Sequence, residues 1–205
     1  MSRLLIELQY FGTISWFLEV IKHDSIVIEA HENFEKSTYR NRCHIASPEG
    51  RLRMTIPLEH GRNQRAKYRD VKISYASGWQ KNHWNSLCSC YRNSPYFEFY
   101  EDRLAPFFNQ RFDFLFDFNK QLLEATLQLM NLNVPIDFTK SFEKTSPLEV
   151  KDFRSQIIPG STDFFPLIYH QVFQERTGFL ADLSILDLLF NEGPHSKELL
   201  LPSSD

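Results

Sequence analysis

The sequence has few of the features that mark secreted, membrane-spanning or nucleic-acid-binding proteins. Its first apolar run, Leu4 to Leu8, is broken by Glu7, so we predict neither a signal peptide nor a transmembrane span. Three cysteines are too few, and odd in number, for a disulfide framework. The net charge of −3 gives no general attraction to nucleic acid. We therefore expect a cytoplasmic protein with no nucleic-acid partner.

The common catalytic and cofactor signatures are also missing. There is no G-x-S-x-G, no H-E-x-x-H and no Walker loop, although a scattered Ser-His-Asp triad stays open. The first loop has a single glycine, Gly12, and this argues against a dinucleotide. The pair Cys88 and Cys90 lacks a second pair of ligands for zinc. We predict no metal and no cofactor, and free thiols at the cysteines.

Aromatic residues, by contrast, are plentiful: 19 Phe, 8 Tyr and 3 Trp. Most of them should lie in the core, because each buries a large apolar area. A chain of 205 residues suits one domain. We predict a single domain over residues 1–205, with an α/β half at 1–78 and a mainly helical half at 79–205.

The start of the chain has the pattern of a compact βαβ unit. Leu4 to Leu8 is typical of a buried strand, and Ser25 to Glu29 of a second one. Between them Thr13 can cap a helix with apolar residues at helical spacing. We therefore predict an α/β fold with a small, mostly parallel sheet, a Rossmann-like start and a largely helical C-terminal half.

Further elements follow from the same periodicities. The helix that starts at Trp79 places His83, Leu87 and Tyr91 on one face. In the last helix Ser184 is the expected N-cap and Asp187 the capping-box residue. The other predicted elements are strands at 52–58, 71–75 and 136–139, a basic loop at 60–69, and helices at 113–132 and 183–191.

Polar residues gather where the first two strands end. The carboxyl ends of parallel strands meet at one edge of a sheet, so the loop at Gln9 should lie near His31 and Lys36. If residues 37–44 are extended, Arg40, Arg42 and His44 face one side, and Tyr39, Asn41 and Cys43 the other. Such arginines bind phosphate or carboxylate, or simply pair with surface acids. Their density favours an anion site.

Two other groups of residues allow more than one interpretation. His83 lies among aromatic residues and is either a buried packing histidine or a catalytic base. Later in the chain Asp152 pairs with Arg154, and Tyr169 with Gln171, on one face if extended. Neither spacing is a known catalytic pattern.

Several motifs together resemble the WbqC-like proteins. The first is Gln9-Tyr10-Phe11-Gly12-Thr13-Ile14-Ser15-Trp16-Phe17, followed by Asp24 and Phe34-x-Lys36-x-x-Tyr39-x-Asn41-Arg42. The others are Ile56-Pro57, Trp79-x-x-x-His83, Tyr91-x-x-Ser94-Pro95-Tyr96-Phe97, Tyr169-x-Gln171 and the segment 183–191. The resemblance covers nearly the whole chain, and it is closest to a short bacteroidete branch of that family.

This resemblance implies a bacterial protein of surface polysaccharide, and in particular O-antigen, biosynthesis. A glycine or small-acyl transferase role is suggested for such proteins. The matching polar residues are Lys36, Tyr39, Asn41, Arg42, His83, Tyr169 and Gln171. Many relatives have prolines in the first loop, where this chain has Gly12 and Thr13, and an acidic residue where His31 stands. Both departures bear on whether the family's mechanism is kept.

Two hypotheses of function follow. In the first, the chain is a transferase of a small amino-acyl or acyl group. Lys36, Arg40 and Arg42 hold an anionic small-molecule donor or sugar nucleotide, and His31 or His83 is the base. In the second, it is a non-catalytic binding or scaffold protein of the same system. The oligomeric state stays open, with a homo-oligomer as one option.

Overall fold

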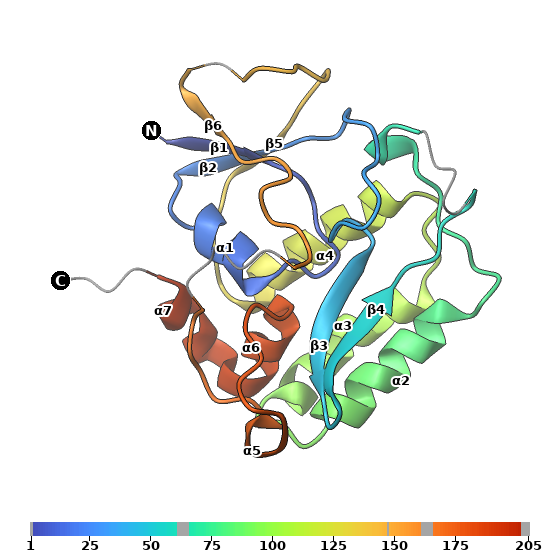
Figure 1. The fold of residues 1–205 in the computed structure, drawn as a ribbon, viewed down its shortest axis with the longest axis vertical. Coiled ribbons are helices and arrows are strands. Elements are labelled where there is room, and N and C mark those ends of the chain that lie inside the picture. The colour runs from blue at the N-terminus through green and yellow to red at the C-terminus, as the bar shows by residue number, and fades with distance from the viewer. Residues whose placement is uncertain (1, 61–65, 147, 161–165, 202–205) are drawn as a thin grey trace.

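The computed structural model describes residues 2–60, 66–146, 148–160 and 166–201 (Figure 1). The strands are β1 (Arg3–Ile6), β2 (Ser25–Ile28), β3 (Arg42–Ser47), β4 (Gly50–Thr55), β5 (Ile136–Phe138) and β6 (Val150–Asp152). The α-helices are α1 (Ile14–Val20), α2 (Trp79–Tyr91), α3 (Phe97–Asn109), α4 (Leu115–Leu129), α5 (Gln174–Thr177), α6 (Ile185–Glu192) and α7 (Ser196–Leu200). Short 3₁₀ turns occupy Tyr68–Asp70 and Gly193–His195.

Four strands form a parallel sheet in the order β5-β2-β1-β6, and β3 and β4 form a separate antiparallel hairpin. The predicted βαβ unit is confirmed, because β1 and β2 are parallel and Leu4 pairs with Ile26. Strand β6 joins the sheet from far along the chain, which the weak periodicity of residues 137–165 did not predict. The predicted α/β class, with its mostly parallel sheet and largely helical C-terminal half, is confirmed.

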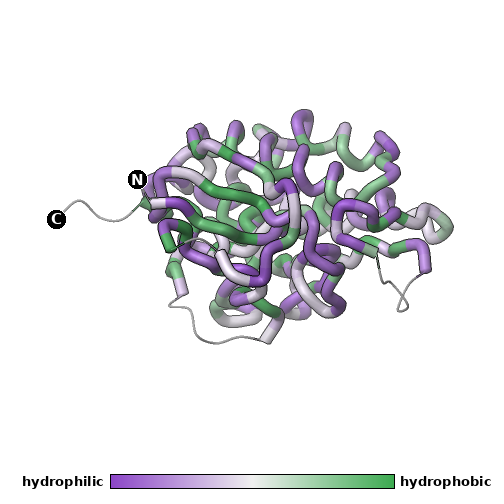
Figure 2. Tube along the Cα trace, turned by 90° about the horizontal axis from the view of Figure 1, so that it is seen from above, coloured by the Kyte–Doolittle hydropathy of each residue, from purple (hydrophilic) through white to green (hydrophobic). Residues whose placement is uncertain are grey.

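The two faces of the parallel sheet differ. Leu4, Ile6 and Ile28 point to the helical side and are fully buried. On the other side Leu5 and Val27 line a cavity of ≈ 490 Å³ beneath residues 137–150. Figure 1 shows the helices below the sheet and the β5–β6 connection above it, and Figure 2 shows the apolar strands side by side. Within the described residues the helices therefore cover one face of the sheet.

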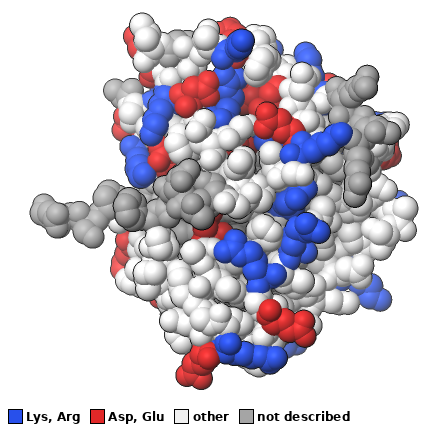
Figure 3. All heavy atoms as spheres, in the orientation of Figure 1, with Lys and Arg blue, Asp and Glu red and all other residues white. Residues whose placement is uncertain are grey.

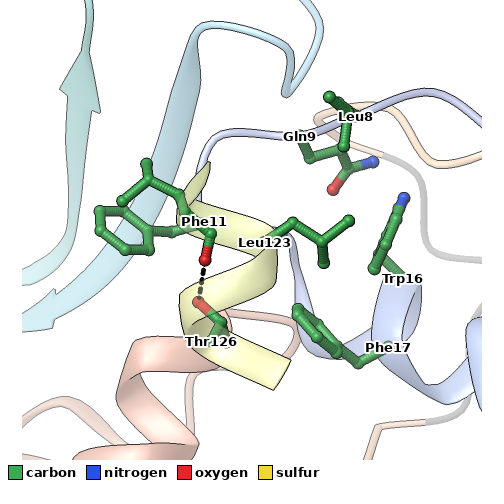
Figure 4. Close-up of a pocket in the computed structure, with 9 residues that line it drawn as sticks. Leu8, Gln9, Phe11, Trp16, Phe17, Leu123 and Thr126 are labelled. Atoms are coloured by element: carbon green, nitrogen blue, oxygen red, sulfur yellow. Dashed lines mark hydrogen bonds between the residues drawn. The ribbon is translucent and has the colours of Figure 1, made fainter. Parts of the chain in front are cut away.

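The loop after β1 does not open into a ligand site. Helix α4 packs Leu122 and Leu123 against Phe11 and Trp16, and the space left there is only ≈ 10 Å³ (Figure 4). Such a space holds about one water molecule. Apolar side chains of α4 therefore fill the space beside the Gln9 loop.

Several local predictions are confirmed. Thr13 caps α1, accepting a hydrogen bond from the Trp16 amide at 3.2 Å, and Ser184 caps α6 in the same way. On α2 the face that carries Trp79, His83, Leu87 and Tyr91 is buried. The three cysteines are free. No helix in the described parts of the chain has the length and apolarity to cross a bilayer.

Other local predictions are wrong. Residues 71–75 form no strand; isolated bridges from Ile73 to Leu58 and from Lys72 to Phe114 stand there instead. The strand expected at 52–58 lies at Gly50–Thr55. Asp187 forms no capping box, because Tyr91 and Tyr169 take its carboxylate. Part of the basic loop predicted at 60–69, residues 61–65, lies outside the described residues.

Candidate functional site

The β3–β4 hairpin carries most of the candidate site. Its inner face is apolar, with Cys43 and Ile45 buried in the core. Its outer face alternates with the inner one, so Arg42 and His44 are only half-buried. Across the ladder Arg42 pairs with Thr55 and His44 with Arg53. The pleat of one short hairpin therefore brings two arginines and a histidine to one surface.

A basic groove lies beside this surface. It has a volume of ≈ 670 Å³ and is bounded by Phe34, Lys36, Ser37, Asn41, Arg42, Arg53, Thr55, Ile56, Pro57 and Leu58. Three of these lining residues are cationic, and none of the described ones is acidic. Figure 3 shows Lys and Arg side chains in a row over the hairpin. We call this the basic groove.

Arg42 is the central cation of the basic groove. Its Nε is buried and has no hydrogen-bond partner within the described part of the chain. Burial lowers the pKa of the guanidinium, and the positive charge of Arg53 lowers it further. Neither Arg42, Arg53 nor Lys36 forms an ion pair with a described carboxylate. No ion pair to a described residue occupies the Arg42 guanidinium, and its planar donors suit an anion.

Asn41 lines the groove from the preceding loop, and the buried Tyr39 lies close to Arg42 without lining the groove. The Asn41 side-chain amide donates to the Ile56 carbonyl at 2.8 Å, and the Ile56 amide donates to the Asn41 carbonyl at 2.8 Å. Asn41 therefore ties the loop to the end of the hairpin. Burial raises the pKa of Tyr39 to about 12, with Asp182 adding to the effect. Its hydroxyl has no hydrogen-bond partner among the described residues, whereas its carbonyl accepts from the Tyr10 amide at 2.9 Å.

Arg40 does not share the outer face, contrary to the prediction for an extended segment. It precedes β3 and is fully buried. Its Nε donates to Glu32 at 2.8 Å, and its terminal nitrogens bond Ser155 at 3.1 Å and Glu35 at 3.5 Å. Burial raises the pKa of Glu32 to about 7, against the lowering effect of Arg40. Arg40 thus belongs to a closed internal ion network.

Gln9 and His31 also lie away from the basic groove. The Gln9 side chain is buried, donates to Glu7 at 3.3 Å and accepts from the Thr13 amide at 3.2 Å. His31 lies beside Arg69, with its Nε2 3.3 Å from a guanidinium nitrogen. Neither residue lines the groove. The segments that follow β1 and β2 do approach each other, however, because the Tyr10 amide donates to the Tyr39 carbonyl.

His83 is a buried packing histidine in this structure. Its Nδ1 lies 2.9 Å from the Tyr10 hydroxyl, and its ring also bonds the backbone of Thr55. Burial lowers its pKa to about 4. Since Thr55 lines the basic groove, His83 supports the groove from behind without lining it.

Tyr169 and Gln171 form a separate buried cluster around Asp187. The hydroxyls of Tyr169 and Tyr91 both donate to Asp187, and the Gln171 amide donates to Tyr169 at 3.0 Å and to the Leu180 carbonyl at 2.9 Å. The Tyr91 hydroxyl also accepts from the Ala46 amide of β3 at 2.9 Å. The cluster therefore anchors the hairpin from behind.

Of the predicted site residues, the structure brings Lys36, Asn41 and Arg42 together and places Tyr39 next to them. Two further residues, Arg53 and His44, were not among the predicted site residues. The alternation along residues 42–44 was the available signal for His44; Arg53 required knowledge of the hairpin register. No cluster of three potential metal ligands occurs within the described residues.

Comparisons with known proteins agree with the resemblance in the sequence. The model of the WbqC-like protein family matches residues 9–158, which is more than half of the chain. The chain is also 24% identical, over 93% of its own length and 91% of the relative's, to "Uncharacterized protein Rv1507c" of Mycobacterium tuberculosis (strain ATCC 25618 / H37Rv). No solved structure matches the chain.

Proposed function

The chain belongs to the WbqC-like protein family, and we propose that it is a transferase that moves a small acyl or amino-acyl group, such as glycyl, onto a sugar. The setting is the biosynthesis of bacterial surface polysaccharide, in particular O-antigen. The anionic ligand is the activated acyl donor or a sugar nucleotide that accepts the group, held by its phosphate or carboxylate in the basic groove.

One observation supports this proposal above the others: a groove with three cationic side chains and no acidic one among its described lining residues. Within a folded protein a buried arginine usually pairs with a carboxylate, as Arg40 does with Glu32. Arg42 instead keeps a buried, unpaired Nε. An anion with planar or tetrahedral oxygens in the groove pairs with the Arg42 guanidinium and offsets its repulsion from Arg53.

The family residues divide into two roles under this proposal. Lys36 and Arg42 contact the donor, and Tyr39 lies beside Arg42. Asn41 fixes the loop that carries them, and His83 supports Thr55. The other residues act indirectly. Gln9 acts through its loop, Arg40 through the ion network, and the pair Tyr169 and Gln171 through the cluster around Asp187. For His31 a direct part in catalysis requires a substrate that extends beyond the groove.

Binding of inorganic pyrophosphate tests the groove. Titration calorimetry at neutral pH and low salt should show that Arg42→Ala weakens affinity at least about tenfold, since a desolvated charged contact is lost. Arg103→Ala removes the same charge from the exposed surface of α3 and serves as the matched control. Equal affinities for wild type and Arg42→Ala would refute the assignment.

Analysis of the native polysaccharide tests the reaction. The gene is deleted in its host, and the surface glycan is examined by mass spectrometry after complementation with wild type or Arg42→Ala. A transferase predicts loss of an acyl or amino-acyl substituent from an otherwise intact glycan in the deletion, with recovery only by wild type. An unchanged substituent would refute the transferase.

A non-catalytic binding protein is the second candidate, because neither His31 nor His83 lines the basic groove. It predicts that glycan assembly as a whole falls in the deletion strain, with no selective loss of one substituent. A selective loss of one substituent therefore separates the transferase from this candidate, which predicts a general loss of the glycan.

A further inference from the structure

His44 lies at the centre of the outer face of the hairpin. Arg42 precedes it on the same face of β3, and Arg53 stands directly opposite on β4. The Tyr39 ring meets the imidazole edge-on, with ring centroids 5.7 Å apart. The backbone carbonyl of His44 accepts from the Ser184 amide at 2.8 Å, which fixes the strand at this point. His44 does not itself line the basic groove, but its imidazole is held beside Arg42 and Arg53, which do.

The ring nitrogens of His44 are uncommitted. Its Nδ1 is buried without a hydrogen-bond partner, and Nε2 makes no hydrogen bond within the described residues. His83 differs, because its Nδ1 bonds Tyr10 and its ring bonds Thr55. Of these two neutral imidazoles, His44 is the one with a nitrogen free to take a proton.

The surroundings keep this imidazole neutral in the free protein. Burial lowers the pKa of His44 to about 4, and the charges of Arg51, Arg42 and Arg53 add to the effect. An anion bound between the arginines cancels part of their field, so it raises the pKa of His44 toward the ordinary value. Donor binding would thus make the imidazole a stronger base at the site.

We infer that His44 is the proton acceptor of the reaction, an inference that rests on the proposed transferase function. The donor is an acyl phosphate anhydride whose phosphate lies against Arg42 and Arg53. The sugar hydroxyl or amine attacks the acyl carbon, and His44 takes the proton of that group. A bond forms between the sugar oxygen or nitrogen and the acyl carbon. The bond from that carbon to the phosphate oxygen breaks, and the phosphate leaves with the electron pair and then receives the proton from His44.

Proton uptake on sulfate binding tests this inference, since sulfate keeps one charge state over the range used. Calorimetry is run in two buffers of different protonation enthalpy, at a pH between about 4 and the ordinary histidine value of 6.5. Wild type should take up a measurable fraction of a proton per sulfate. His44→Gln should take up none and still bind sulfate within about threefold of wild type.

The other titratable groups near His44 need their own controls. Burial raises the pKa of Asp182, whose carboxylate accepts from the Ser15 amide at 2.8 Å and which faces Tyr39 and Arg51. Asp182→Asn should retain the proton uptake. With a pKa of about 12, Tyr39 does not titrate in this range. NMR titration of the His44 ring in wild type, with and without sulfate, gives the same answer without a variant.

Each result has a distinct meaning. If Arg42→Ala weakens sulfate binding but wild type and His44→Gln take up equal numbers of protons, the inference about His44 is wrong and the basic groove stands. If the NMR pKa of His44 does not rise with sulfate, the conclusion is the same. If sulfate binds wild type and Arg42→Ala equally, the groove assignment fails, and the inference about His44 fails with it.

Discussion

Arg40 and Arg42 are two residues apart, yet they have opposite surroundings. Arg40 is fully buried and bonds Glu32, Glu35 and Ser155. Arg42 is half-buried, lines the basic groove and leaves Nε without a partner. The Arg40 guanidinium stabilises the fold through these bonds, whereas the Arg42 guanidinium is available to a ligand. Strand β3 begins at Arg42, so Arg40 lies in the loop before the strand and does not follow its alternation.

The comparison shows that a density of basic residues does not by itself define a binding site. The internal ion network around Arg40 contains Glu7, Glu29 and Glu32 as well as Arg154, so its charges satisfy one another. In the basic groove, by contrast, the charged residues among the described lining residues are all positive. Of these two arginines, it is Arg42 that keeps a donor without a partner among the described residues.

The largest expected effect is a loss of stability when the internal ion network around Arg40 is broken. Arg40→Ala leaves the Glu32 carboxylate buried without its cation, and we expect a loss of about 3–5 kcal/mol in the free energy of unfolding. Urea denaturation of Arg40→Ala and Arg42→Ala gives the contrast, with Arg42→Ala within about 0.5 kcal/mol of wild type. Equal stability losses in the two variants would break the comparison.

A smaller effect concerns the pH dependence of stability. The folded protein raises the pKa of Glu32 from 4.5 to about 7, so between these values it binds more protons than the unfolded chain. Stability should therefore fall as pH rises through this window, by at most about 1.4 kcal/mol per pH unit. Denaturation of Glu32→Gln should lack this component. Parallel curves for the two proteins would show that Glu32 does not titrate there.

The third effect tests the role of His83 behind the groove. His83→Ala removes the partner of the buried Tyr10 hydroxyl, and we expect a loss of about 1–3 kcal/mol in stability. Pyrophosphate affinity of the folded variant should change less than about threefold, because His83 does not line the groove. A fall in affinity as large as that of Arg42→Ala would mean that His83 contacts the anion.

The smallest effect is expected at Arg53. This side chain is more exposed than Arg42, so Arg53→Ala should weaken pyrophosphate binding only about two- to fivefold. Arg103→Ala again provides the control for loss of one charge. Calorimetry at two salt concentrations should show a larger loss at low salt. A loss of affinity larger than that of Arg42→Ala would show that Arg53 on β4, and not Arg42, is the main contact of the anion.

The βαβ start and the main helices could be predicted from the sequence because they depend on local apolar periodicity. Thr13, Ser184 and the buried face of α2 are examples. Strand β6 could not, since three residues with a weak pattern become a strand only by pairing with β1. Asp187 had the right spacing for a capping box, but two tyrosines from distant segments bind it instead.

The candidate site was predicted in part for the same reason. Lys36, Asn41 and Arg42 lie close in the chain and remain close in space. Arg53 depends on the register of the hairpin, and the burial of Arg40 depends on Glu32 and on Ser155, which comes from beyond β6. His31 is close to the groove residues in the sequence, and His83 lies behind the groove in space. Neither lines the groove, because tertiary packing decides which side chains reach it.

Arginine side-chain NMR during a pyrophosphate titration tests the central claim most directly. The Nε–Hε signal of Arg40, already bonded to Glu32 at 2.8 Å, should be present from the start and should barely move. The signal of Arg42 should shift progressively and saturate as the anion takes its free donor. Movement of the Arg40 signal with an unchanged Arg42 signal would contradict the account.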